Sequence, residues 1–133
     1  MKEVNDVMKP SSAPPIPTHE DDRLVKSYVL YTLMLDMLAK DIAVLKHSSS
    51  TLYLSDLYTR GLDRLQQHIT HELTSTRRDM RARGIKVLEE QRGPAGIEVH
   101  YLCRGYRRFF SMLPRFARSE VRRELSRLFQ IVH

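Results

Sequence analysis

A long apolar repeat between residues 18 and 47 constrains the fold more than any other feature of this chain. Apolar side chains recur there at alternating steps of four and three, the spacing that lines one face of a packed helix. They are Leu24, Tyr28, Tyr31, Leu35, Leu38, Ile42 and Leu45. Thr18 and the acids that follow it are typical of a helix start, so we predict one helix from Thr18 to about His47.

A second apolar stripe widens this helix's apolar face to more than half of its circumference. Its members are Val25, Val29, Leu33, Met34 and Met37. One neighbouring helix cannot cover so wide an arc. We therefore expect the helix either to lie at the centre of the fold or to be shared with a second copy of the protein, as a homodimer through this first helix.

The polar residues 47–51 end the first helix and offer hydroxyl groups that can cap a second one. Helical spacing then continues from Leu54 to Met80, and Gly84 is a typical residue to follow a helix end. Two long helices joined by so short a connection run antiparallel as a rule. The first two thirds of the chain therefore predict a long antiparallel helical hairpin.

After Gly84 the apolar period changes to two, which predicts a β-hairpin over about residues 85–104 with its turn at 93–96. Strict alternation in its first strand puts Ile85, Val87 and Glu89 on one face and Lys86, Leu88 and Glu90 on the other.

Residues 106–110 do not indicate a class, and Pro114 is well placed to begin a final amphipathic helix. The fold class expected is α+β, mainly α: a long antiparallel helical hairpin, then a β-hairpin and a C-terminal amphipathic helix.

Composition divides the chain into an arm and one domain. Four prolines and two serines in residues 9–17 disfavour a helix, so residues 1–17 are expected to form a disordered N-terminal arm. Residues 18–133 suit a single domain. The sequence has no long uncharged apolar run and no apolar signal segment, from which we expect a cytoplasmic protein without a membrane partner.

Positive charge is concentrated in the C-terminal part. Residues 77–133 carry 14 Lys or Arg against six Asp or Glu, and 13 of the 14 are arginine, whose planar fork suits phosphate and carboxylate groups. Aromatic side chains lie between them, which offers surfaces for stacking on bases. The residues expected to contact nucleic acid are Arg77, Arg78, Arg81, Arg107, Arg108, Arg115, Arg118 and Arg122.

The leading hypothesis is a small basic regulatory protein that binds nucleic acid through this arginine-rich half. The alternative is an adaptor or assembly subunit whose arginines meet an acidic protein partner.

Motifs of catalysis are weak in this sequence. His68, His71 and Glu72 lie at helical spacing but lack a matching set of metal ligands, and Cys103 and His100 fall on opposite faces of one strand. We read Cys103 as a small core residue. No glycine-rich phosphate loop and no nucleophile motif is present, so we expect a protein that is not an enzyme, with no metal and no cofactor.

Three short stretches, RRDMRARGIKV from Arg77, VHYLCRGYRR from Val99 and LPR before the last helix, carry a family resemblance. Together with the order of helical pair, hairpin and closing helix, they resemble the small uncharacterised YhjD-like proteins of spore-forming Firmicutes over about residues 20–133. The resemblance implies a bacterial cytosolic setting and, since that family has no assigned activity, nothing about a reaction.

Overall fold

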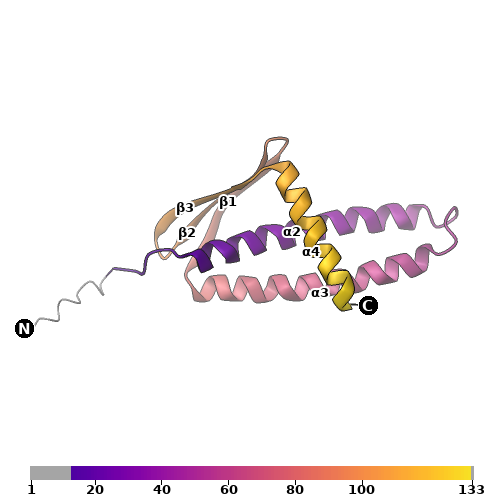
Figure 1. Cartoon of the computed structure of the whole chain (residues 1–133), viewed down its shortest axis with the longest axis horizontal. Helices are drawn as coiled ribbons and strands as arrows, with labels where there is room; N and C mark the ends of the chain where they lie inside the picture. Colours follow the sequence, from indigo (N-terminus) through magenta and orange to yellow (C-terminus); the bar gives the residue numbers. More distant parts are fainter. Residues whose placement is uncertain (1–12, 133) are drawn as a thin grey trace, which may run out of the picture.

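The computed structural model describes residues 13–132, which form three helices and one three-stranded sheet (Figure 1). The elements in chain order are α2 (His19–His47), α3 (Ser55–Ala82), β1 (Ile85–Gly93), β2 (Gly96–Cys103), β3 (Tyr106–Met112) and α4 (Pro114–Val132). This confirms the predicted class, mainly α with an antiparallel sheet, and Pro114 begins the last helix as expected.

Helices α2 and α3 form the predicted antiparallel hairpin, and α4 crosses both of them obliquely (Figure 1). The start of α2 is a capping box. The Asp21 N–H donates to Thr18 Oγ1 and the Thr18 N–H donates to Asp21 Oδ2, so that two backbone donors at the helix end are satisfied. The hydroxyl groups of residues 47–51 do not cap α3. Its N-cap is Leu54, and no side chain makes a capping hydrogen bond there.

The sheet has the order β1-β2-β3 with both pairs antiparallel, so the predicted hairpin is extended by a third strand. The new strand occupies the residues whose class the sequence left undecided. A two-residue turn makes it possible, because Arg104 and Gly105 have φ values of 51° and 89° and fit the tight turns that join twisted strands.

A bulge at Leu88 corrects the predicted alternation of β1. Val87 lies opposite Tyr101, but the next pairs are Glu89 with His100 and Glu90 with Val99, so Leu88 has no partner across the ladder. Beyond the bulge the faces of the strand exchange. Glu90 therefore shares the helix-facing side of the sheet with Val99, while Glu89 and Leu88 are exposed.

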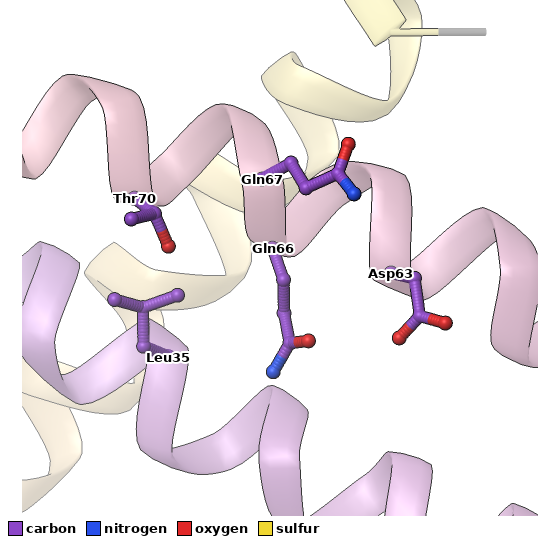
Figure 2. A pocket seen from close by; sticks show the side chains of 5 residues that line it. All are labelled: Leu35, Asp63, Gln66, Gln67 and Thr70. Atoms are coloured by element: carbon purple, nitrogen blue, oxygen red, sulfur yellow. The ribbon is translucent and has the colours of Figure 1, made fainter.

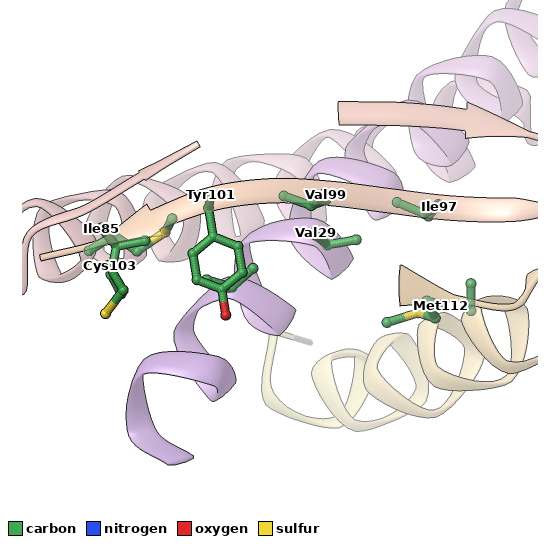
Figure 3. Packing of buried hydrophobic residues seen from close by; sticks show 10 residues of the cluster. Val29, Ile85, Ile97, Val99, Tyr101, Cys103 and Met112 are labelled. Atoms are coloured by element: carbon green, nitrogen blue, oxygen red, sulfur yellow. The ribbon is translucent and has the colours of Figure 1, made fainter. Parts of the chain in front are cut away.

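Two apolar clusters share α2. The first packs the helix-facing side of the sheet against the N-terminal half of α2, and its buried members include Val29, Val99, Tyr101 and Cys103 (Figure 3). The second lies where α4 crosses the hairpin and includes Met34, Ile69 and Leu128. Cys103 is thus a buried core residue, as predicted.

The wide apolar arc of α2 is covered within one chain by α3, the sheet and α4. Val44, near its C-terminal end, is the one large apolar side chain of α2 that is exposed. In the described residues, α2 therefore has no wide uncovered apolar face that would call for a second copy of the chain. The homodimer stays a prediction.

The buried carboxylate of Asp21 joins four segments of the chain. Arg104 of the β2–β3 turn donates to Asp21 Oδ2 at 2.7 Å, and Arg83, just after α3, donates to Asp21 Oδ1 at 3.1 Å. The Arg104 guanidinium also donates to the backbone oxygens of Pro15 and Ile16. Part of the predicted arm is thus held against the turn. The rest of that arm, residues 1–12, lies outside the described residues.

We expect Asp21→Asn to lower the free energy of unfolding by about 3 kcal/mol, because it leaves arginine charge without its buried partner. The matched control is Asp56→Asn, which removes the exposed pair with Arg60 and should cost less than about 1 kcal/mol. Urea denaturation followed by circular dichroism measures both. Equal effects of the two substitutions would contradict the role given to Asp21.

The Arg104 guanidinium also holds the pKa of Asp21 well below its usual range. A carboxylate with a lowered folded-state pKa stabilises the fold above the unfolded pKa of about 3.9, and that stabilisation is lost as the pH falls through the folded-state pKa. Urea midpoints measured from pH 7 downwards should therefore fall less steeply below about pH 4 in Asp21→Asn than in the unchanged protein. Parallel profiles would contradict this linkage.

Candidate functional site

The eight arginines expected to contact nucleic acid separate into seven free ones and one that is paired. Arg108 lies on the helix-facing side of β3 and binds the Asp22 carboxylate at 3.3 Å. Among the described residues the other seven are exposed and form no ion pair. Arg108 therefore joins β3 to α2, whereas the charges of the other seven arginines are available to a ligand.

Arg115, Arg118 and Arg122 form a row along the exposed side of α4, which we call the α4 row. The opposite side of the helix is held by Ala117, Val121 and Leu128. Because buried positions recur at three and four residues, they share one side of α4, and the residues on the opposite side, which include the α4 row, are left in solvent.

The acids of α4 form ion pairs with cations outside the α4 row. Glu120 is buried, is contacted by Lys26 of α2 at 2.9 Å and is also paired with Arg123, while Glu124 is paired with Arg127. Lys26 in particular lowers the pKa of the Glu120 carboxyl. Both acids are engaged with other cations, so they do not neutralise the α4 row.

Arg77, Arg78 and Arg81 form a second group near the C-terminal end of α3, which we call the α3 group. Arg77 lies over the Tyr28 ring, 5.6 Å from its centroid. Arg77 and Arg81 also line a hollow of about 190 Å³ beside β1.

The α4 row and the α3 group lie at opposite ends of the sheet. The α3 group precedes Ile85, which pairs with Cys103, whereas α4 follows Met112, which pairs with Ile97. Ile97 and Cys103 are six positions apart in β2, which is about 20 Å of strand. The two groups therefore do not merge into one patch, and each has to meet its ligand separately.

The aromatic residues between the arginines are mostly used in packing. Tyr101 is buried and its hydroxyl donates to Asp22 at 2.8 Å, and burial raises the pKa of Tyr101 to about 12. Phe110 is half-buried, and the Tyr106 hydroxyl donates to the Pro14 oxygen. Phe109 and Phe116 remain as the clearly exposed rings, with Lys26 over the ring of Phe116.

Two arginines whose structural roles sequence reasoning missed connect distant elements. Arg104 binds Asp21, and Arg92 binds Asp36 and Glu90 and donates to Thr32 Oγ1 at 2.9 Å. Arg92 faces the helices because the bulge reverses the faces of β1. Gly84, the residue before Ile85, is a sequence signal that another side chain passes close to the backbone there, and that side chain is Arg104. Gly84 has φ of 72°, and a Cβ added there would lie 2.9 Å from Arg104 Cγ, so only glycine lets this side chain pass.

A hollow of about 470 Å³ lies between α2 and α3 (Figure 2). Leu35 is its one apolar wall residue, and Asp63, Gln66, Gln67 and Thr70 supply the rest. In Figure 2, Asp63 and Gln66 point towards α2, while Gln67 points away from it. This lining provides hydrogen-bonding groups but neither a paired base nor a strong nucleophile.

Within residues 13–132, no three His, Cys, Asp or Glu side chains lie close enough together to hold a metal ion, and this includes His68, His71 and Glu72. None of the helices there combines the length and the apolar character that crossing a bilayer requires.

Burial raises the pKa of the Cys103 thiol, so we expect it to be unreactive in the folded protein. Ellman's reagent should label the folded chain more than about tenfold more slowly than the chain in urea, since the reagent needs the thiolate and access to it. The chain has one cysteine, so complete labelling in urea serves as the internal standard. Rapid stoichiometric labelling under native conditions would contradict the core role of Cys103.

Comparison with known protein families gives a match that covers most of the chain. The model of the family described as YhjD protein matches residues 16–133, which is nearly the whole of the described chain. No curated protein and no solved structure matches the sequence. The matched region contains all three helices, the sheet and both arginine groups. The chain therefore belongs to the YhjD family.

Proposed function

We propose that this chain is a small regulatory protein, without enzymatic activity, that binds nucleic acid through the α4 row and the α3 group. Its setting is the bacterial cytosol, and its relatives are those of the spore-forming Firmicutes that the sequence resembles. The observation that carries the proposal is the partition of the arginines. Seven of the eight expected contact residues are exposed and without an ion pair in the described chain; six of them form the two groups, and the seventh, Arg107, lies on β3.

The spacing of the α4 row suits a phosphate backbone. Arg115 and Arg122 are seven residues apart, which is about 10 Å along a helix. Phosphates of one strand follow one another about every 3.4 Å along the duplex axis, so the row can face roughly three of them. Arginine forks bind phosphate oxygens in pairs, which orients the helix as well as holding it.

These contacts position the protein without reading a sequence. Phosphate contacts fix the position of a protein on the duplex but carry no base information. The affinity we expect is therefore mainly electrostatic and strongly dependent on salt.

An acidic protein surface is the alternative ligand for the same arginines. Both kinds of ligand need negative charge, but they respond differently to an added competitor. Free DNA or RNA displaces a bound nucleic acid, whereas it leaves a specific protein partner bound.

The test is fluorescence anisotropy of labelled duplex DNA and RNA at several salt concentrations. We expect micromolar binding whose log–log salt slope falls by roughly two to three when Arg115, Arg118 and Arg122 are all changed to Glu, because each phosphate contact contributes about 0.9 to the slope.

The matched control changes Lys40, Lys46 and Arg64 to Glu. These three cations are exposed and without an ion pair in the described chain, and they lie on the helical hairpin away from both arginine groups. The total charge change is the same, so a specific role for the α4 row predicts a much smaller loss in the control. Equal losses, or binding only at very low salt, would reject the proposed surface.

A further inference from the structure

One face of the sheet is uncovered in the described part of the chain. The helices pack on the side that carries Ile97, Val99 and Tyr101, and the alternate residues of all three strands point the other way. We call this second side the outer face. Paired positions place nine of its residues in three rows across the strands: Lys86, Leu102 and Arg107; Glu89, His100 and Phe109; Gln91, Glu98 and Ser111.

The middle row carries two neighbouring rings. Phe109 on β3 is 54% exposed, and its centroid lies 4.9 Å from that of His100 on β2, with the rings tilted by 52°. The core does not need Phe109, because the adjacent Phe110 points to the helix-facing side and packs there. An exposed phenylalanine beside a histidine on a strand pair offers flat surfaces on which bases can stack.

The first row adds positive charge beside these rings. Lys86 and Arg107 are exposed and form no ion pair among the described residues. Lys86 follows the end of α3 by four residues, so this basic end of the outer face continues from the α3 group. Glu98 in the third row and Glu89 in the middle row are exposed acids that repel phosphate. The phosphates of a bound strand are therefore confined to the basic first row, and only its bases lie over the two rings of the middle row.

We propose that the outer face binds a short single-stranded segment of nucleic acid, with one or two bases stacked on Phe109 and His100 and phosphates held by Arg107 and Lys86. This inference rests on the proposed function and narrows its ligand class. Bases of an intact duplex are stacked on one another and cannot lie on a sheet, whereas unpaired bases can.

A second copy of this chain fits the outer face less well. Stable protein interfaces need about 20–30 residues on each side, and three rows of three residues fall far short of that. A strand of nucleic acid needs only a few rings and cations at each nucleotide, which is the scale of this surface.

The test compares a short single-stranded RNA of mixed sequence with its duplex, using labelled RNA and anisotropy. Phe109→Ala should weaken binding of the single strand at least fivefold, the lower end for loss of one stacked base at about 1 kcal/mol, and leave duplex binding within about twofold. Phe129→Ala removes another half-exposed phenylalanine, on α4, and should change neither.

A second variant keeps the inference testable if Phe109→Ala disturbs folding. The chain has no tryptophan, so Phe109→Trp introduces a single indole on the outer face. Its fluorescence should be quenched when the single strand is added and should not change with duplex at the same occupancy.

The outcomes separate the two proposals. If the unchanged protein binds neither single strand nor duplex, the proposed function fails, and this inference fails with it. If the protein binds through the α4 row while Phe109→Ala is neutral and the new indole is not quenched, the inference about the outer face is overturned and the proposed function stands.

Discussion

The buried carboxylate of Asp21 is the interaction on which the arrangement of the elements depends. It completes the capping box of α2, receives Arg83 from the end of α3 and Arg104 from the β2–β3 turn, and through Arg104 reaches the backbone of residues 15 and 16. An ion buried this fully is stable only with all its partners in place, so it fixes where the sheet lies on α2. The orientation of the outer face follows from that contact.

The arginines of the C-terminal half fall into two sets that composition alone does not distinguish. Arg83, Arg92, Arg104 and Arg108 join elements far apart in sequence to acids on α2. Arg77, Arg81, Arg115 and Arg122 have no such partner among the described residues. Internal pairing therefore explains part of the excess positive charge, and the remainder is grouped at the two ends of the sheet rather than spread evenly.

The helices were predictable because their apolar spacing is long and regular, and Thr18 and Pro114 mark their starts. The third strand was missed because Arg107 and Arg108 interrupt its apolar pattern, although Arg108 does face the helices and pairs with Asp22. The bulge at Leu88 was not predicted either, because one inserted residue reverses the faces of a strand and leaves no signal in the sequence. Arg108 pairs with Asp22 and Arg104 with Asp21, and in each pair the two residues are more than 80 positions apart in the sequence, so no local pattern predicts the contact.

The most direct test of ligand binding by the arginine groups and the outer face is heteronuclear NMR of the isotopically labelled protein during titration with a short single-stranded RNA. We expect the amide shifts that move to lie along the α4 row, at the end of α3 and on the outer face around Phe109, with Asp21 and the loop between α2 and α3 unchanged. Shifts confined to that loop or to the hollow beside Leu35, or no shifts at saturating RNA, would contradict the account.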